Sequence, residues 1–422
     1  MDENGGPVNL PDCLTGDFNR EMLFNFHLRL YDDACKIRNA FWENITLDGW
    51  QREKTRLSNL FLKMFGPFPK KCDLNERITK SFKRDGYRVE NVMYDSVPGM
   101  PITANCYIPV HVNGKAPGIV LACGHAQAGK AYARYQLAAI NLVRSGMVVL
   151  CFDPISQGER VQLWDHIKRR MMAAFEHNVL DMAATLVGKS IAGQFVWDCI
   201  RSIDYLASRP EVDIKRIGMT GCSGGGTQTT WTVSVDERIS AAVPICFITS
   251  IRERLLSREP ADAEQNPPGM LMEGLGYEDF LAMMAPKPLL IAAAKEDFFP
   301  IQGARDTVKK LSRLYALSGN SDRIELYEGK GHHGLSDEIR LAMCEWFRRW
   351  FNLPAPLKYR EAELETEIQL QVTKTGQLAS DGTTVNYYSA LKKQFVSLKA
   401  DKPDKNDIYK VLGIPGEKHV PE

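Results

Sequence analysis

The 422-residue chain carries 53 basic and 52 acidic residues, and this near balance gives no sign of a nucleic-acid or membrane-surface partner. Its 10 cysteines are scattered without a C-x-x-C pair, which argues against a disulfide framework and against a zinc site built on cysteine. A chain of this length can bury one large core, with added segments or a second domain.

The N-terminus shows no basic region followed by an apolar stretch, so the chain as written carries no signal peptide. No run of about 18 apolar residues occurs, so we expect no segment that spans a membrane. The expected location is the cytoplasm for the chain as written, and the periplasm or the exterior if a leader has been removed. The sequence leaves the oligomeric state open.

Residues 1–85 are predicted to form a helical segment outside the catalytic pattern. Asp17 can cap a helix that runs to about Ile37, and Thr46 can begin a second helix that ends at Phe65. Apolar and aromatic residues recur at helical spacing in the first of these helices. This spacing predicts a packing face against the main domain, and the alternative is that some of the aromatic residues border the substrate cleft.

Strand signals begin near residue 86 and then alternate with helical stretches. The expected strands cover residues 87–96, 102–109, 118–122, 147–152, 216–220, 241–247, 288–294 and 323–327, and the first two form a hairpin. The helices expected between them cover residues 131–144, 194–208, 301–317 and 336–351. Because consecutive β-α-β units require a parallel sheet, residues 86–353 are predicted to form a catalytic domain with a doubly wound, mostly parallel α/β sheet.

Three segments fall outside this alternation. Residues 161–190 are rich in Met and predict a helical insertion, and residues 250–285 predict an irregular excursion, so that the sheet carries cap insertions. Residues 354–422 are polar and rich in lysine, with little periodicity. They are predicted to form a C-terminal appendage of unknown role, either packed on the domain or belonging to a further module.

One stretch carries the strongest chemical signal. The expected strand 216–220 runs into Gly221-Cys222-Ser223-Gly224-Gly225, which has the G-x-S-x-G pattern and precedes a helix-compatible run at 227–235. A strand, a tight turn carrying Ser and a helix are typical of a nucleophile elbow, in which small flanking residues let strand and helix pass closely. We therefore predict Ser223 as a nucleophile, and the alternative is a Gly-rich turn with an incidental Ser.

Acyl transfer by serine also needs a base, and an acid that orients the base, in the chain order Ser, acid, His. Asp297 follows one of the expected apolar strands, and His333 follows the next strand and opens the last helix. Both positions lie after the carboxyl ends of strands, where catalytic loops gather. The predicted triad is therefore Ser223, Asp297 and His333.

Other residues could take the place of the acid or the base. His332 is the rival of His333, which is preferred because Gly334 lets the chain turn into the helix with the imidazole aimed inward. Glu296 points to the opposite side of its extended segment from Asp297. A further possibility is an acid on the excursion after the strand 241–247, and its candidates are Asp262 and Glu264.

Attack on an ester places negative charge on the carbonyl oxygen, and hydrogen-bond donors must stabilise that charge. The first predicted donor of this oxyanion hole is the backbone N–H of Gly224, next to the nucleophile. The second is expected from the loop after the strand 118–122, where Ala126 is preferred and His125 and Gln127 are the alternatives. The side chain of His125 is expected to brace this turn by hydrogen bonding, and direct catalysis is its alternative role.

Several motifs beyond the elbow carry a family resemblance. The first is the run 197–213, which begins with Trp197-Asp198 and continues with Arg201-Ser202-Ile203-Asp204. The others are Gln157-Gly158-Glu159-Arg160 after Asp153, Asp262-Ala263-Glu264-Gln265-Asn266, Ala285-Pro286-Lys287-Pro288 and Asp297-Phe298-Phe299-Pro300. Together they resemble the acetyl xylan esterase and dienelactone-hydrolase-like branch of the α/β-hydrolases over roughly residues 86–352. The resemblance implies an α/β-hydrolase fold and a serine esterase with Ser223 as nucleophile, Asp297 as acid and His333 as base. Ser156 stands where that branch usually has Gly, a difference that is expected to change the shape of the cleft wall.

The favoured function is a serine carboxylic-ester hydrolase that removes acetyl or other short acyl groups from xylan-type carbohydrate or from small esters. This chemistry needs no metal or organic cofactor, so none is expected, and the partner is a small-molecule or polysaccharide ester. One alternative is a prolyl-oligopeptidase-type serine peptidase, although residues 1–85 are too few for the propeller that such enzymes usually carry. The other is a hydrolase-fold binding protein without activity, a class that typically loses the Ser or the His.

Overall fold

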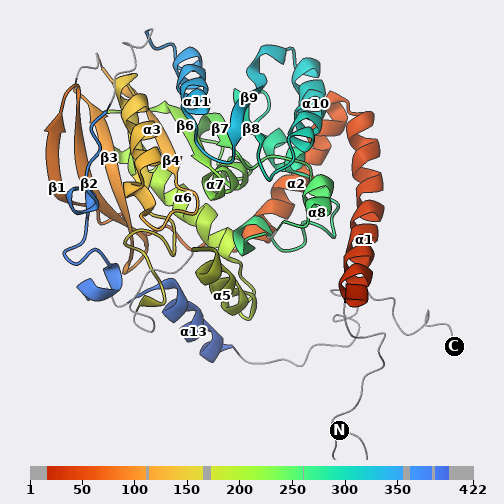
Figure 1. Ribbon diagram of the computed structural model, residues 1–422, viewed down its shortest axis with the longest axis horizontal. Helices are drawn as coiled ribbons and strands as arrows, with labels where there is room; N and C mark the ends of the chain where they lie inside the picture. The colour runs from red at the N-terminus through yellow and green to blue at the C-terminus, as the bar shows by residue number, and fades with distance from the viewer. Residues whose placement is uncertain are drawn as a thin grey trace, which may run out of the picture.

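A nine-stranded sheet organises the chain (Figure 1). The computed structural model describes residues 17–110, 114–164, 173–259, 261–354, 362–382 and 385–398. In sheet order the strands are β1 (Arg77–Arg84), β2 (Tyr87–Val97), β3 (Met100–Pro109), β5 (Val148–Phe152), β4 (Ala116–Ala122), β6 (Val212–Cys222), β7 (Ile239–Ile245), β8 (Leu289–Glu296) and β9 (Ile324–His332). Pairing is antiparallel from β1 to β5 and parallel from β5 to β9, so the predicted mostly parallel sheet is confirmed.

Helices cover both faces of this sheet. On one face pack α3 (Ala133–Arg144) and α11 (Asp337–Trp350). On the other face pack α2 (Leu47–Phe65), α6 (Ile191–Ser208), α7 (Gly224–Val233) and α10 (Ile301–Leu317). The remaining helices are α1 (Asp17–Glu43), α5 (Ala173–Thr185), α8 (Ile251–Ser257), α9 (Tyr277–Leu281), α12 (Glu367–Leu370) and α13 (Tyr387–Ser397). Among the described helices, none combines the length and the apolar character that a membrane span requires.

The central strand β4 shows why this sheet needs helices on both faces. Ile119 and Leu121 belong to the core under α3 and α11, whereas Val120 and Ala122 belong to the core under α6 and α7. Successive side chains of a strand point to opposite faces, and here both sets are apolar and fully buried. Strands of a parallel sheet covered on both sides have this continuous apolar character.

The two N-terminal helices pack on the main domain, as the spacing of their apolar residues predicts. α2 begins at the predicted cap, where Thr46 Oγ1 accepts a hydrogen bond of 3.1 Å from the Gly49 N–H. The rings of Phe61 and Phe280 stack with their centroids 4.2 Å apart. Trp42 in α1 donates from Nε1 to the buried Asp279 carboxylate at 3.0 Å. α1 continues to Glu43, beyond the predicted end at Ile37.

The edge strand β1 was missing from the predicted elements. Its residues are almost all exposed, because β1 pairs with β2 alone and lies at the edge of the sheet. Four of its eight residues are Arg or Lys, and positive charge on an edge strand discourages pairing with another chain. The sheet therefore begins at Arg77, before the expected start of the catalytic domain at residue 86, and the domain boundaries stay a prediction.

The described part of the C-terminal appendage packs on the domain. Tyr387 and Leu391 of α13 join a small core with Leu180 of α5 and Phe195 of α6, and Figure 1 shows α13 beside α5. α5 lies in the predicted helical insertion at 161–190, of which residues 165–172 lie outside the described residues, as do 355–361 and 399–422 of the appendage. Of the two expectations for this appendage, packing on the domain holds for the described residues.

Candidate active site

Ser223 sits at the turn between β6 and α7 in a backbone conformation that serine rarely adopts. Its φ and ψ are 61° and −122°. The turn is held from both sides, because the Ser223 N–H donates to the Ile245 carbonyl at 2.9 Å and the Ser223 carbonyl accepts from the Thr227 N–H at 2.9 Å. A strained serine between a strand and a helix is the geometry of a nucleophile elbow, which presents its hydroxyl at the carboxyl edge of the sheet.

The glycines around Ser223 allow the elbow to pass close to the neighbouring strand. A Cβ added at Gly221 would lie 2.4 Å from the Ala122 carbonyl oxygen, and one added at Gly225 would lie 2.1 Å from the same atom. Both distances are far below van der Waals contact, so glycine is required at both positions by the backbone of β4.

His333 and Asp297 form a close pair in the loops after β9 and β8. His333 Nδ1 lies 2.8 Å and 3.0 Å from the two carboxylate oxygens of Asp297, whose side chain is 1% exposed. An ionised carboxylate only accepts hydrogen bonds, so Nδ1 carries the proton and Nε2 keeps the lone pair that a general base needs. The ring of Phe298 lies 4.3 Å from the imidazole, centroid to centroid, and helps to fix its orientation.

The rival pair, His332 and Glu296, lies outside this arrangement. The side chain of His332 is 84% exposed, and its Nε2 is 3.5 Å from Glu296 Oε2. His333, by contrast, lines the same cleft as Ser223. The structure thus places Asp297 against His333, and His333 and Ser223 in one cleft, while the triad and its catalytic roles stay a prediction.

The two predicted oxyanion donors differ in their surroundings. Gly224 is the first residue of α7, so its N–H is one of the helix N-terminal groups that have no acceptor within the helix. The Ala126 N–H donates to the Gly124 carbonyl at 2.7 Å and is engaged within its own loop. Gln157 Nε2 donates to the same carbonyl at 2.5 Å and fixes the loop further. The role of Ala126 stays a prediction, and the N–H groups of His125 and Gln127 are the alternatives beside it.

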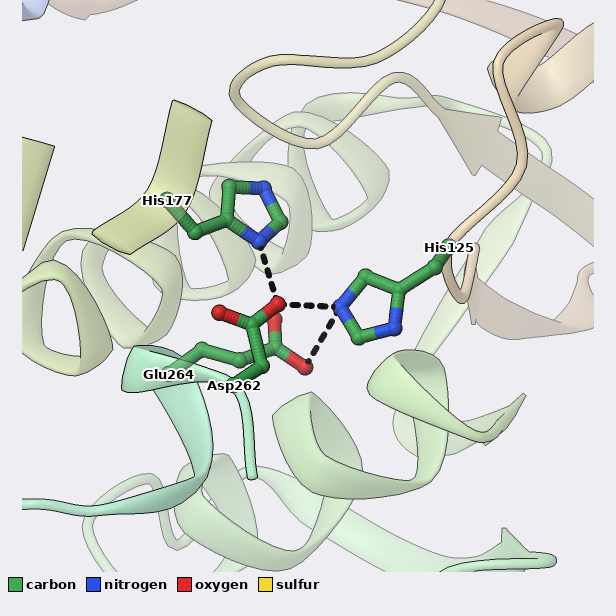
Figure 2. A group of neighbouring side chains, drawn as sticks. All are labelled: His125, His177, Asp262 and Glu264. Atoms are coloured by element: carbon green, nitrogen blue, oxygen red, sulfur yellow. Dashed lines mark hydrogen bonds and ion pairs between the residues drawn. The ribbon is translucent and has the colours of Figure 1, made fainter. Parts of the chain in front are cut away.

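A second group of ionisable side chains lies against the elbow (Figure 2). His125 Nε2 is 2.6 Å from Asp262 Oδ2 and 3.2 Å from Glu264 Oε1. His177 Nδ1 is 2.7 Å from the same Asp262 oxygen. A Cβ added at Gly224 would lie 2.7 Å from Glu264 Oε1, so this group touches the residue that follows the nucleophile. We call these four side chains the His-carboxylate cluster.

The two alternative acids, Asp262 and Glu264, belong to this cluster. Asp262 and Glu264 contact His125, whereas the carboxylate that contacts His333 is Asp297. Burial would lower the pKa of His125, but Glu264 and Asp262 outweigh it and raise this pKa to about 10. Burial would raise the pKa of the Asp262 carboxyl, but hydrogen bonds from the two histidines hold it well below its usual range. These contacts fit the bracing role expected for the His125 side chain.

His177 was not among the predicted site residues. It lies on α5 in the helical insertion, fully buried, and its sequence signal is one histidine in a mostly apolar helix. Such a residue is usually a satisfied core histidine, and the carboxylate that it meets lies 85 positions further along the chain. The pattern along the sequence could not bring the two together.

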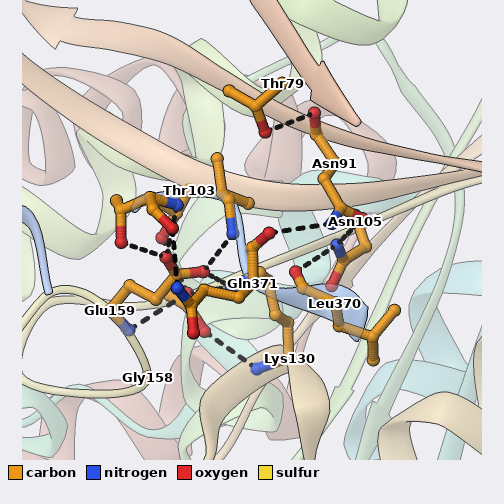
Figure 3. Close-up of polar contacts among 12 residues, drawn as sticks. Thr79, Asn91, Thr103, Asn105, Lys130, Gly158, Glu159, Leu370 and Gln371 are labelled. Atoms are coloured by element: carbon orange, nitrogen blue, oxygen red, sulfur yellow. Dashed lines mark hydrogen bonds and ion pairs between the residues drawn. The ribbon is translucent and has the colours of Figure 1, made fainter. Parts of the chain in front are cut away.

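A buried ionic network joins the segment after β4 to the loop after β5. Lys130 Nζ lies 2.6 Å from Glu159 Oε1, as Figure 3 shows. The same Nζ lies 2.6 Å from Asp153 Oδ2. Burial would lower the pKa of Lys130, but the two carboxylates outweigh it and raise this pKa. Glu159 also accepts hydrogen bonds from the N–H groups of Val372 at 2.9 Å and Thr373 at 2.7 Å. The appendage is thereby tied to the loop that follows β5.

Two asparagines of the sheet hold the same segment of the appendage. Asn105 Nδ2 donates to the Leu370 carbonyl at 2.9 Å, and Asn91 Nδ2 donates to the Gln371 carbonyl at 2.9 Å, as Figure 3 shows. Buried amides of this kind need partners, and the appendage backbone supplies them. The segment that follows Glu367 is therefore part of the domain's polar interior.

Ser156, on the loop after β5, takes up the conformation for which glycine is suited. Its φ is 72°, and its buried hydroxyl has no hydrogen-bond partner within the described structure. In the folded state, the left-handed conformation costs a residue with a side chain about 1–2 kcal/mol. Glycine avoids this cost but lowers the free energy of unfolding by about 0.4–1 kcal/mol, because it makes the unfolded chain more flexible. The resemblance to a family with Gly here therefore has a backbone explanation.

We expect the change Ser156→Gly to raise the free energy of unfolding by up to about 1 kcal/mol, because strain is removed at little cost in contacts. Urea unfolding measures this quantity. Ser145→Gly is the matched control, since Ser145 has a φ of −82° and its hydroxyl bonds to the Asn141 carbonyl, so that change should be destabilising. A clear loss of stability in Ser156→Gly would contradict the expected strain.

Ser223 and His333 open into a cleft of about 640 Å³, a size typical of sites for small molecules or for one unit of a polymer. Gln127, Arg134 and the ring of Tyr132 line it, and Glu367 joins them from the appendage. A larger hollow of about 750 Å³ lies between α1 and α8 and contains none of the predicted site residues. The chemical groups therefore gather in the smaller of the two.

Family models match two overlapping parts of the chain. The acetyl xylan esterase (AXE1) model matches residues 68–258, and the prolyl oligopeptidase family model matches residues 189–353. Both matches include the elbow at Ser223. Methylesterase BT1017 superposes on the chain with a TM-score of 0.71 at 22% identity, over 88% of this chain and 80% of that one. The chain has the α/β-hydrolase fold, and its residues 68–258 are similar to the acetyl xylan esterase family.

Other solved structures share this fold. A Bacteroides fragilis protein named as an acetyl xylan esterase gives a TM-score of 0.60 at 16% identity, over 77% of this chain and 83% of that one. A glucuronoyl esterase from Solibacter usitatus gives 0.56 at 16% identity, over 72% and 94%. The predicted α/β-hydrolase fold is confirmed.

A curated relative matches part of the chain. YtaP of Bacillus subtilis (strain 168), a protein named as a hydrolase, is 26% identical over 169 residues, which are 39% of this chain and 56% of YtaP. The chain thus spans little more than half the length of that relative.

Proposed function

We propose that this chain is a serine esterase that cleaves carboxylic esters of carbohydrates, with acetyl and other short acyl groups as its preferred acids. The observation that carries the proposal is the arrangement of three groups around one cleft. Ser223 lies at a strained elbow, His333 lines the same cleft, and the buried carboxylate of Asp297 contacts Nδ1 of His333. Each feature comes from a different loop at the carboxyl edge of the sheet.

The geometry supports a two-step acyl transfer. Ser223 Oγ attacks the ester carbonyl carbon while His333 Nε2 takes the hydroxyl proton, and Asp297 stabilises the imidazolium that forms. The Gly224 N–H and an N–H of the loop after β4 stabilise the oxyanion. His333 then protonates the leaving alcohol, and the acid stays bound to Ser223 as an ester. Water, deprotonated by His333, releases the acid and restores the serine.

The lining of the cleft supports a carbohydrate ester as substrate. A sugar offers hydroxyl groups for hydrogen bonds and an apolar ring face for stacking on an aromatic side chain. Gln127, Arg134 and Glu367 supply hydrogen-bonding groups, and the half-exposed ring of Tyr132 supplies an aromatic surface. The similar structures are named for acetyl xylan, glucuronoyl and methyl esters, and cleavage of each of these is hydrolysis of a carboxylic ester.

The peptidase alternative rests on the prolyl oligopeptidase family match to residues 189–353. The described residues before β2 form two helices and an edge strand, so no propeller filters access to the cleft from that part of the chain. An open cleft over the same catalytic groups favours an ester of an extended polymer over a short peptide.

Three substrates separate these possibilities: acetylated xylan, methyl-esterified polygalacturonan and a chromogenic prolyl peptide. We expect acetate release from xylan with the wild type, and a loss of about 10⁴-fold or more in Ser223→Ala at unchanged circular dichroism. Faster release of methanol from polygalacturonan would move the proposal to esters of sugar acids. Peptide cleavage alone, or acetate release that survives Ser223→Ala, would overturn it.

A further inference from the structure

We propose that the His-carboxylate cluster binds one divalent transition-metal ion, Zn²⁺ above all others. One donor atom from each of His125, His177, Asp262 and Glu264 lies within 4.8 Å of the other three. The four residues come from three separate segments: the loop after β4, helix α5 and the short turn at residues 262–265. This inference stands on the cluster alone and does not depend on the proposed esterase activity.

The hydrogen bonds of His177 fix which of its nitrogens has a free lone pair. Nε2 lies 3.0 Å from the Ile155 carbonyl oxygen, and a carbonyl can only accept, so Nε2 carries a proton. In neutral imidazole the other nitrogen, Nδ1, then has a lone pair. Nδ1 faces Asp262 Oδ2 at 2.7 Å, so with neutral imidazole two lone pairs point at each other, and either a proton on Nδ1 or a metal ion between the two atoms relieves this repulsion. A histidine held to a backbone carbonyl by one nitrogen is the usual support of a metal-ligating histidine.

The same carboxylate oxygen meets the second histidine. Asp262 Oδ2 lies 2.6 Å from His125 Nε2, so one oxygen is close to nitrogens of both histidines, as Figure 2 shows. Glu264 Oε1, with its side chain 2% exposed, lies 3.2 Å from His125 Nε2 but makes no hydrogen bond. A buried carboxylate oxygen without a hydrogen bond is costly unless a charge nearby compensates for it. It points at the space that the other donors share.

The donor set favours zinc or a similar ion over calcium or magnesium. Two imidazole nitrogens and two carboxylates suit Zn²⁺, whereas Ca²⁺ and Mg²⁺ select oxygen ligands. Two neutral histidines and two carboxylates carry a charge that a divalent ion balances. Ligand atoms around a tetrahedral ion at about 2.0–2.1 Å lie about 3.3 Å apart, so the two short contacts to Asp262 would lengthen by less than about 1 Å.

A cation in this place would hold the wall of the ester cleft. His125 lines the cleft with Ser223, and Glu264 touches the backbone of Gly224. An ion shared by these residues would fix the loop after β4 against the start of α7, where both predicted oxyanion donors lie. The ion thus has a positioning role, and the acyl-transfer steps need no direct bond to it.

Calorimetric titration of the chelator-treated full chain with ZnCl₂ tests the site. We expect one ion per chain, with binding weakened about 10–100-fold or more in His177→Gln and in Asp262→Asn. His27→Ala is the matched control, because it removes an exposed histidine on α1 outside the cluster and should leave binding unchanged. Ser223→Ala should also bind Zn²⁺ as the wild type does, which separates this inference from the esterase proposal.

Thermal unfolding of the wild type with added Zn²⁺ is a second test, and it does not depend on whether the variants fold. Zn²⁺ should raise the thermal midpoint of the chelator-treated wild type, since a ligand that binds the folded state stabilises it. CaCl₂ at the same concentration should raise it less. Absence of specific uptake by the folded wild type, or binding unchanged in both cluster variants, would overturn the proposal and leave the cluster as an ion-pair network with protonated histidines.

Discussion

Replacing His333 by alanine is expected to lower kcat for ester hydrolysis by about 10⁴–10⁶-fold, because Ser223 then loses the base that takes its proton. The expectation rests on one nitrogen. Asp297 holds Nδ1 of His333 at 2.8 Å, which leaves Nε2 as the nitrogen that can accept a proton, and His333 lines the same cleft as Ser223. Hydrolysis of p-nitrophenyl acetate under saturating substrate measures the effect, with burst kinetics to separate acylation from release.

His332→Ala is the matched control for this variant. The two histidines are neighbours in sequence, but the His332 side chain is 84% exposed and lies beside Glu296. We expect its removal to change kcat by less than about threefold, as for a surface substitution away from the chemistry. A large loss in His332→Ala with little loss in His333→Ala would show that the base is the other histidine.

The change Gly225→Ala is expected to lower the free energy of unfolding by about 3–5 kcal/mol, or to prevent folding. A Cβ at this position would lie 2.1 Å from the Ala122 carbonyl oxygen and 2.9 Å from the carbonyl carbon of the same residue. Both atoms belong to the backbone of β4 in the middle of the sheet, so they cannot rotate away as a side chain could. Urea unfolding followed by circular dichroism measures the loss.

Gly146→Ala is the control that separates the steric clash expected at Gly225 from the strain of placing a side chain at a positive φ. Gly146 has a φ of 89°, and a Cβ there would meet no atom within 4 Å. Strain alone should therefore cost about 1–2 kcal/mol. If Gly225→Ala were no more destabilising than Gly146→Ala, the tight packing of the elbow against β4 would be wrong.

The close pair of Asp297 and His333, and a place for Ser223 in the same cleft, could be predicted from the sequence because each part has a local signal. Ser223 lies in a strand-turn-helix pattern, and Asp297 and His333 each follow an apolar strand that belongs to a parallel sheet. Parallel strands end at a common edge, so residues far apart in the chain meet there. The preference for His333 over its neighbour His332 rests on Gly334, which lets the chain turn into the last helix with the imidazole of His333 aimed inward.

The parts that the sequence did not predict depend on contacts with no local signature. β1 is a polar edge strand, so it lacks the alternation of a half-buried strand. The appendage backbone forms hydrogen bonds with the side-chain amides of Asn91 and Asn105 and with the Glu159 carboxylate. The sequence around such a polar residue does not indicate which backbone segment it will bind.

The His-carboxylate cluster shows the same limit in a stronger form. Asp262 and Glu264 were candidates for the acid of the triad, and His125 was expected to brace its loop. Only the fold shows that these residues meet one another and His177. The expectation that no metal is needed came from cysteine spacing and from serine chemistry, and neither bears on a site of two histidines and two carboxylates.

The most direct test of the nucleophile is covalent trapping. Diisopropyl fluorophosphate phosphorylates a serine that is activated by an adjacent base, and peptide mass mapping locates the adduct. We predict one adduct per chain, on Ser223, formed in the wild type and strongly slowed in His333→Ala. A folded wild type that hydrolyses p-nitrophenyl acetate while Ser223 stays unmodified, or an adduct on a different residue, would contradict the assignment of Ser223 as the nucleophile.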